Sequence, residues 1–90
     1  MSKIIFDPAK DVANLRKHGL SLAEAGYLEW DTALIWPDAR RDYGELRLSA
    51  LVLRKERLFF VAFVERKEGL RIISLRKANR KEVLKYAEND

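Results

Sequence analysis

The sequence predicts an α+β fold in which an antiparallel meander sheet carries two helices near the N-terminus and one at the C-terminus. Apolar runs separated by short polar breaks follow one another from Leu46 to Arg76, which is typical of antiparallel strands joined by tight turns. Two helix-start signatures precede this stretch and one follows it. With 90 residues, of which 48% are hydrophobic and 36% charged, the chain fits a single small domain over residues 1–90.

The first elements are a short strand and a helix. Lys3–Phe6 is mostly apolar, and we expect it to form the first strand. Asp7 can accept the unpaired amide hydrogens at a helix N-terminus, and Pro8 suits the first helical turn. Gly19 can adopt the left-handed conformation that ends a helix. The sequence therefore predicts a helix between Asp7 and Gly19.

A second short helix and a brief strand come next. Ser21–Glu24 has the spacing of a capping box, which predicts a helix running to about Glu29. Thr32–Trp36 resembles a brief strand, which Pro37 interrupts because proline cannot continue a central ladder. The polar stretch Asp38–Gly44 is expected to be a loop.

The meander follows, with a helix after it. Leu46–Leu53, Leu58–Val64 and Leu70–Arg76 are the three predicted strands, and a four-residue polar break joins the first two as a hairpin. The middle strand is apolar on both faces, so we expect it to be central and covered on both sides. Asn79, with a glutamate three residues later, predicts a last helix that ends near Glu88.

The lengths of the two turns decide where two arginines of the meander lie. A two-residue first turn places Arg47 opposite Val64. If the second turn spans residues 66–69, Arg71 also faces Val64, and the two guanidinium groups could clamp a phosphate. A three-residue second turn would instead set Arg71 opposite Glu65 as a cross-strand ion pair. Both registers are compatible with the sequence.

Positive charge is concentrated in the second half of the chain. Residues 1–45 carry six Lys/Arg and eight Asp/Glu, a net −2, whereas residues 46–90 carry twelve and six, a net +6. Between Arg66 and Glu82 seven Lys/Arg stand against two Glu, a local +5. Such a segment suits the binding of a polyanion, although an ordinary solvated face has the same composition.

Composition and motifs argue against several classes of protein. The absence of cysteine excludes disulfides and thiolate metal sites and is typical of the reducing cytoplasm. The sequence has no metal-binding spacing and no glycine-rich phosphate loop, so we expect no metal and no cofactor. No apolar run approaches the ~20 residues that a membrane helix needs, and the N-terminus lacks the apolar region of a signal peptide. These features predict a cytoplasmic protein without a membrane partner.

The residues that remain could cleave RNA. RNA carries its own nucleophile in the 2′-hydroxyl, so cleavage needs alignment, proton transfer and positive charge rather than a metal. Arg47, Arg71 and Arg76 could hold phosphates and stabilise a pentacoordinate phosphorane. His18 could act as a general acid or base, or it could simply complement the negative end of its helix. For Glu65, at a strand end, the ordinary interpretation is ion pairing.

The chain resembles the BrnT family of toxins from type II toxin–antitoxin systems. The order and spacing of the matching residues hold over nearly the entire chain. These are Phe6–Lys10 with Asn14, Lys17–Gly19, Ser21, Glu24 with Ala25, Gly44 with Glu45 and Arg47, Arg71–Ser74, Arg76–Ala78, Glu82 and Tyr86.

The resemblance implies a RelE-like fold, metal-independent RNA cleavage and inhibition of translation and growth. It also implies neutralisation by a cognate BrnA-like antitoxin of the ribbon-helix-helix type in a heterotetramer, which reaches promoter DNA only through the antitoxin. The implied catalytic residues are Arg47, Arg71 and Arg76, with His18 and Glu65 as proton-transfer candidates. The implied RNA-binding residues are Lys17, Lys77, Arg80 and Lys81. The alternative function is a module that binds RNA or a partner through its basic face without cleaving anything.

Overall fold

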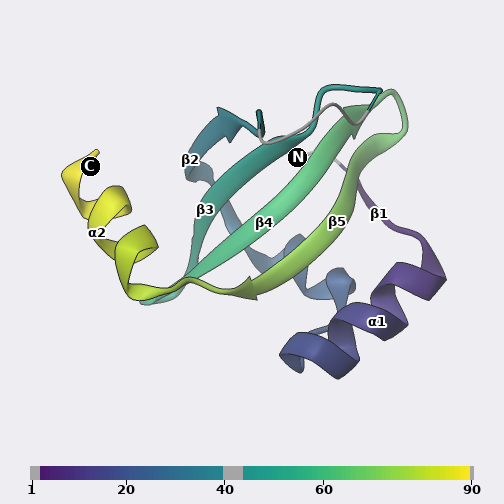
Figure 1. Ribbon diagram of the computed structural model, residues 1–90, viewed down its shortest axis with the longest axis horizontal. Coiled ribbons are helices and arrows are strands. Elements are labelled where there is room, and N and C mark those ends of the chain that lie inside the picture. Colours follow the sequence, from purple (N-terminus) through teal and green to yellow (C-terminus); the bar gives the residue numbers. More distant parts are fainter. Residues whose placement is uncertain (1–2, 40–43, 90) are drawn as a thin grey trace.

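The computed structural model describes residues 3–39 and 44–89, and within them five strands form one sheet in the order β1-β5-β4-β3-β2 (Figure 1). The predicted α+β class is therefore confirmed. Part of the expected loop after Trp36, residues 40–43, lies outside the described residues. The elements are β1 (Ile4–Ile5), α1 (Pro8–His18), the 3-10 helix η1 (Leu22–Tyr27), β2 (Glu29–Pro37), β3 (Leu48–Arg54), β4 (Arg57–Arg66), β5 (Gly69–Lys77) and α2 (Arg80–Glu88).

The sheet is mostly, but not wholly, antiparallel. β3, β4 and β5 form the predicted antiparallel meander, and β2 pairs antiparallel with β3. β1, in contrast, runs parallel to β5, with Ile4 opposite Leu70 and Ile5 opposite Arg71. The Leu70 amide donates to the carbonyl of Lys3 at 2.7 Å. This approach is so close that a side chain at Gly69 would overlap the Lys3 carbonyl oxygen. The prediction of a purely antiparallel sheet was wrong at this edge, because the N-terminus returns to pair with the last strand.

Both hairpins of the meander have two-residue turns, and the register follows from them. Leu53 lies opposite Leu58, as a two-residue first turn predicts. In the second hairpin Arg71 lies opposite Val64 rather than opposite Glu65. Of the two registers that the sequence allowed, the structure therefore has the one that brings Arg71 level with Val64.

The predicted first and last helices are confirmed at their ends. The Asp7 carboxylate accepts from the amide of Ala9 at 2.9 Å, and Gly19 has a φ of 72° beyond the end of α1. At α2, the Asn79 side chain and the Glu82 carboxylate each accept from the other residue's backbone amide at 2.9 Å, so the capping box is complete. Local sequence signals determine both helices.

The second helix differs from the prediction, since η1 is a 3-10 helix that ends at Tyr27. A carboxylate of α1 fixes the N-terminus of η1. Asp11 accepts from the Ser21 hydroxyl at 3.0 Å and from the Leu22 amide at 2.7 Å. The Glu24 carboxylate is directed instead toward Arg54, 3.5 Å away. A contact from α1 thus holds the start of η1, and β2 begins at Glu29, two residues after η1 ends.

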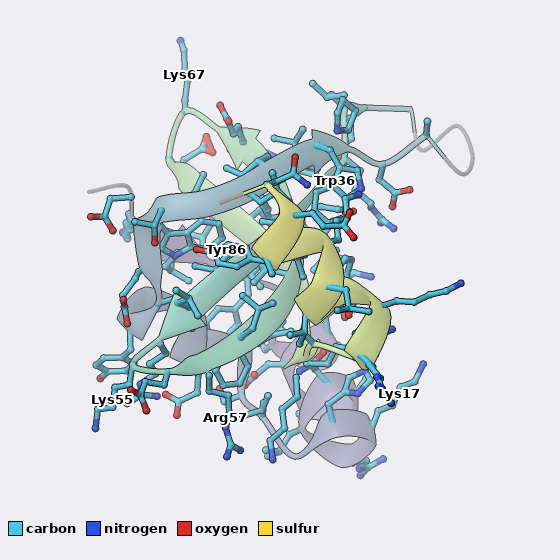
Figure 2. All side chains as sticks on the ribbon, turned by 90° about the vertical axis from the view of Figure 1, so that its left-hand side faces the viewer. Lys17, Trp36, Lys55, Arg57, Lys67 and Tyr86 are labelled. Atoms are coloured by element: carbon cyan, nitrogen blue, oxygen red, sulfur yellow. The ribbon has the colours of Figure 1, made fainter. Side chains whose placement is uncertain are left out.

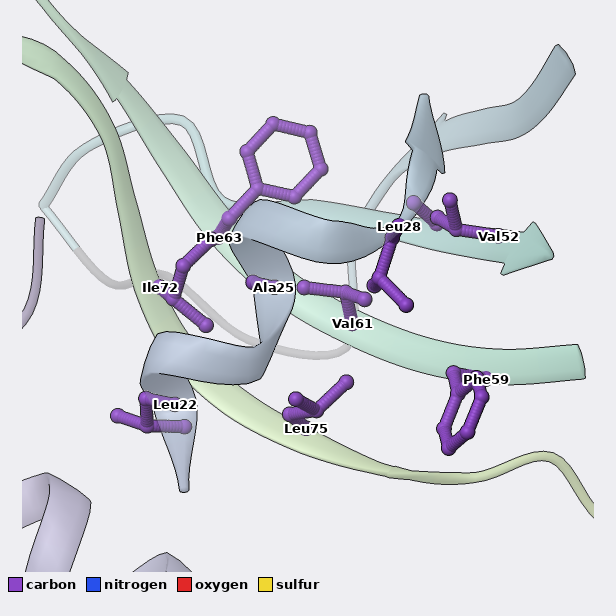
Figure 3. Close-up of a cluster of buried hydrophobic side chains, with 10 residues drawn as sticks. Leu22, Ala25, Leu28, Val52, Phe59, Val61, Phe63, Ile72 and Leu75 are labelled. Carbon is purple, nitrogen blue, oxygen red and sulfur yellow. The ribbon is translucent and has the colours of Figure 1, made fainter. Parts of the chain in front are cut away.

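β4 is the central strand and is buried on both faces, as predicted. On one face η1 covers the sheet with three apolar side chains (Figure 3). These pack on side chains of β3, β4 and β5, and the fully or nearly buried members of this cluster are Leu22, Ala25, Leu28, Ala50, Val52, Phe59, Val61, Phe63, Ile72 and Leu75. On the other face Leu51, Ala62 and Val64 are buried as well.

Asn14 ties α1 to the edge of β5. β1 covers only the beginning of that edge, and further along it the Asn14 side chain takes the place of a neighbouring strand. Its amide nitrogen donates to the carbonyls of Leu75 at 2.8 Å and Leu20 at 2.9 Å, and its amide oxygen accepts from the Leu75 amide at 3.1 Å. The side chain is buried, and its bonds satisfy two buried backbone groups of Leu75 and a partly buried one of Leu20.

We predict that Asn14→Ala lowers the free energy of unfolding by about 3 kcal/mol, because two buried backbone groups and one partly buried group lose their partners at about 1 kcal/mol each. Urea denaturation measures this. Lys10→Ala, an exposed position on the same helix, is the control and should stay within about 0.5 kcal/mol of the native protein. A loss below about 1 kcal/mol for Asn14→Ala would contradict the bridging role.

Candidate functional site

A β-bulge in β5 brings two of the predicted arginines to the same face of the sheet. The pairing of β4 with β5 shifts by one residue between Ala62 and Phe63, and Ile73 is the extra residue in β5. Side chains alternate between faces along a strand, so Arg71 and Arg76, five positions apart, would normally point in opposite directions. The extra residue reverses this, and both arginines emerge on the face opposite to η1.

Arg47 lies at the same level of the sheet as Arg71. It directly precedes β3, and the β3–β4 register continued by one residue brings it opposite Val64. Its backbone carbonyl accepts from the Asp38 amide at 2.8 Å, and its Nε atom is buried. By register, Arg47, Arg71 and Arg76 therefore share one face, which we call the arginine face.

The arginines of this face nevertheless line different hollows. Arg71 borders a hollow of about 360 Å³ together with Asp7 and Arg66, next to β1. Arg76 borders another, of about 220 Å³, which we call the Arg76 hollow; its lining is Trp36, Pro37, Asp38, Ala39, Ser49, Phe60, Arg76 and Glu82. Arg71 and Arg76 therefore lie at different points along β5, and they do not line a common hollow.

The Arg76 guanidinium is held in a fixed orientation. Its two terminal nitrogens each donate to one oxygen of Glu82 at 2.8 Å, and Nη1 also donates to the carbonyl of Lys77 at 3.2 Å. The Phe60 ring lies under it, 4.3 Å from Cζ to the ring centroid. Hydrogen bonding from Arg76 lowers the pKa of Glu82, and the backbone amide of Asn79 adds to this. Glu82 is therefore ionised at neutral pH and neutralises part of the arginine's charge.

Several members of the Arg76 hollow were missed by the reasoning from sequence. Glu82 was interpreted only as a helix-capping residue, yet it also holds Arg76. Trp36 packs against Phe60 with ring centroids 6.4 Å apart, and the Lys85 ammonium lies 3.7 Å from the centroid of its ring. Asp38 is buried in the same wall. The proximity of Glu82 to the end of β5 was a usable signal, but the packing of Trp36 was not visible in the sequence.

His18 and Lys17 lie at the edge of β5, one helical turn beyond Asn14. They border a hollow of about 180 Å³ with Ile73 and Ser74, which we call the α1 hollow. Burial lowers the pKa of His18, and the charges of Lys17 and Arg76 lower it further. The imidazole is therefore neutral at pH 7 and can accept a proton.

The remaining predicted site residues lie away from the two hollows. Glu65 is exposed at the end of β4 and, by alternation, lies on the face opposite to the arginine face. Lys77, Arg80 and Lys81 are exposed where β5 passes into α2. Arg80 and Lys81 occupy the first turn of a helix, where the helix dipole disfavours cations. An anion bound beside these two cations would offset their unfavourable interaction with the helix dipole.

Two further searches of the described residues are negative. No group of three His, Cys, Asp or Glu side chains in residues 3–39 and 44–89 is placed to hold a metal ion. None of the helices in this part of the chain has the length and apolar character needed to span a bilayer.

Comparison with known proteins identifies one family. A family model described as "Ribonuclease toxin, BrnT, of type II toxin-antitoxin system" matches residues 6–82. A comparison with curated proteins finds no match. The matched range includes every residue that lines the Arg76 hollow and the α1 hollow.

We predict that Glu82→Gln lowers the free energy of unfolding by about 1 kcal/mol at pH 7, because the Arg76–Glu82 ion pair is lost. Glutamine can keep the capping bond to Asn79, so the substitution isolates the charge. The pKa of Glu82 is lowered in the folded protein, so its contribution is present above its ordinary value of 4.5 and is lost as the pH falls through the lowered pKa. Urea denaturation across this range should show the two proteins converging in acid. A difference that does not change with pH would contradict the ion-pair assignment.

Proposed function

The chain belongs to the BrnT family of ribonuclease toxins of type II toxin–antitoxin systems, and on this basis we propose that it is a metal-independent endoribonuclease of RelE-like fold. It cleaves RNA at the C-terminal half of β5 and thereby inhibits translation and growth in the cytoplasm. The family match over residues 6–82 is the observation that carries the proposal. The proximity of a neutral histidine to a fixed arginine supports the location of the site.

The chemistry uses the nucleophile of the substrate. The RNA 2′-oxygen attacks the adjacent phosphorus, its proton passes to a base, and the 5′-oxygen leaves with a proton from a donor. His18 is the proton acceptor, because its lowered pKa keeps it neutral at pH 7. Arg76 stabilises the charge that develops on the phosphorane, since its guanidinium is already oriented by Phe60 and Glu82.

Ser74 connects the two sides of this site. It alternates with Arg76 on the arginine face, and it also lines the α1 hollow beside His18 and Lys17. A phosphate over Ser74 would therefore meet the imidazole from one side and the guanidinium from the other. We assign proton transfer to His18 and not to Glu65, because the register sets Glu65 on the other face of the sheet.

The flanking cations bind the rest of the substrate. We assign phosphate contacts to Arg47 and Arg71 further along the arginine face, and to Lys17, Lys77, Arg80 and Lys81 around the end of β5. Membership of the family also implies an antitoxin partner. We propose that it is a BrnA-like antitoxin of the ribbon-helix-helix type, which forms a heterotetramer with the toxin and carries the contacts to promoter DNA.

We predict that the purified protein cleaves RNA in the presence of EDTA, and that Arg76→Gln lowers kcat/KM about 100-fold because an oriented donor to the phosphorane is lost. Glu82→Gln is the matched control, since it removes the charge of the ion pair, whereas the amide oxygen of the substituted side chain can still accept from the guanidinium, which also stays over the Phe60 ring. It should stay within a few-fold of the native protein. Expression of the native protein without antitoxin should arrest growth, and Arg76→Gln should relieve the arrest.

The outcomes separate the alternatives. If the two substitutions reduce cleavage equally, Arg76 acts only by holding α2. If RNA is retarded in a salt-dependent way but returned whole by every preparation, the chain is a binding module and the proposed activity is wrong.

The pH dependence of cleavage tests His18. A base must be deprotonated to act, and the pKa of His18 lies below its ordinary 6.5. We therefore predict that kcat/KM has a plateau between about pH 7 and 8, and that its acid limb, which falls tenfold per pH unit, is centred below pH 6.5. His18→Asn should lower the plateau and remove this acid limb. An unchanged acid limb in His18→Asn would assign the base to another group.

A further inference from the structure

The β3–β4 hairpin carries a second cationic hollow that the proposed mechanism does not use. It measures about 380 Å³, and its lining is Arg54, Lys55, Glu56, Arg57 and Phe59. We call it the hairpin hollow. Arg54 and Arg57 lie directly opposite each other across the two strands, so like charges face each other at the closing pair of the hairpin. Such a pair is unfavourable for folding alone, and an anion bound beside it would offset the repulsion.

The two arginines of this pair have different surroundings. Arg54 is 3.5 Å from the Glu24 carboxylate and lies over the ring of Tyr27, 5.1 Å from Cζ to the centroid. Arg57 is exposed and has no carboxylate within ion-pair distance among residues 3–39 and 44–89. Arg54 is thus part of the scaffold, whereas the charge of Arg57 is available to a ligand.

The hairpin is held in place before any ligand arrives. The backbone amide of Lys55 donates to the Glu29 carboxylate at the start of β2, and Lys55 itself has a φ of 57°, an uncommon conformation for a residue other than glycine. Together with the Arg54–Glu24 pair, this fixes the tip to η1 and β2. A hollow fixed in this way loses little conformational entropy on binding.

The hollow adjoins the basic end of β5. Lys77 lies opposite Phe59, so it stands on the same face as Arg57 and diagonal to it. The amide of Ala78 donates to the carbonyl of Leu58 at 3.0 Å, which joins the start of α2 to the hairpin. Figure 2 shows Arg57 and Lys55 projecting from the same end of the molecule, with Lys17 on its flank. Cations therefore continue from the proposed cleavage site around the end of the sheet to the hairpin.

Aromatic surface lies among these cations. The Tyr27 side chain is 66% exposed next to Arg54, and Phe59 forms the floor of the hollow. Cations that track a phosphate backbone, together with a ring on which bases can stack, are the features by which proteins bind single-stranded nucleic acid. An acidic protein segment would use the cations but would have no need of an exposed ring.

We propose that the hairpin hollow is a subsite for the single-stranded RNA that flanks the cleaved bond, with Arg57 and Lys77 on phosphates and Tyr27 stacked on a base. The proposal rests on the ribonuclease function and extends it to the length of the substrate. RNA that reaches the hollow gains binding, whereas a fragment too short to reach it is cleaved without its help.

The test compares Arg57→Gln with Lys67→Gln, which removes the same charge at the opposite end of β4 (Figure 2). The probes are an RNA of about 16 nucleotides with a mapped cleavage site, a tetranucleotide centred on that site, and a copy of the long RNA with a 2′-deoxy nucleotide at the cleaved position. Arg57→Gln should weaken binding of the uncleavable RNA about tenfold and reduce the salt slope of the affinity by about one. It should raise KM for the long RNA and leave cleavage of the tetranucleotide unchanged. Lys67→Gln should alter neither.

The two proposals fail in different ways. Unchanged affinity of Arg57→Gln for the uncleavable RNA overturns the subsite, even if the native protein cleaves RNA normally. Intact RNA in all preparations overturns the ribonuclease function. In that case the affinity of Arg57→Gln for unmodified single-stranded RNA of the same length decides the subsite. If Arg57→Gln weakens the complex with the antitoxin and leaves RNA affinity unchanged, the hollow binds the protein partner and the RNA assignment is wrong. Because Arg57 is exposed and faces a like charge, its substitution should leave the melting temperature unchanged or slightly raised.

Discussion

The bridge from Asn14 to the backbone of Leu75 is the contact on which the arrangement of the site depends. β5 receives only a two-residue partner strand at its beginning, and beyond it the strand edge would be an open ladder. The Asn14 amide closes this edge at one residue and, through Leu20, also holds the end of α1. The hydrogen bonds set the position of α1 along β5, and through it the position of His18 beside Ser74.

The bulge at Ile73 is the second constraint, and it acts together with the bridge. Without an extra residue, a strand with Arg71 and Arg76 would present these cations on opposite faces. The bulge aligns them on one face, and it lies between the end of the β1 pairing and Leu75, where β5 pairs with β4 on one side and the described residues place no strand along its other edge. Residues of β5 therefore line three hollows: the one beside β1, the α1 hollow and the Arg76 hollow. A substrate lying along β5 would meet positive charge over its whole path.

Local signals in the sequence predicted the elements, and long-range contacts decided the rest. The Asp7 cap, the Asn79 capping box and the first tight turn involve residues a few positions apart, so the pattern alone suffices for them, whereas the length of the second turn was left open. The parallel β1–β5 pairing and the Asn14 bridge join residues about sixty positions apart, and no periodicity encodes them. For the site, sequence indicated the cations of β5, but the contact of Trp36 with Phe60 and the separation of Glu65 emerge only from the register and the packing.

In the proposed function, RNA lies over the C-terminal half of β5 and the adjoining end of α1. The most direct test is a map of backbone amide shifts of the ¹⁵N-labelled protein on addition of RNA with a 2′-deoxy nucleotide at the cleaved position. We expect the largest changes at His18, at residues 74–77 and at the tip of the β3–β4 hairpin. Changes confined to the β4–β5 turn at residues 67–68, with His18 and Arg76 unaffected, would contradict this placement of the RNA.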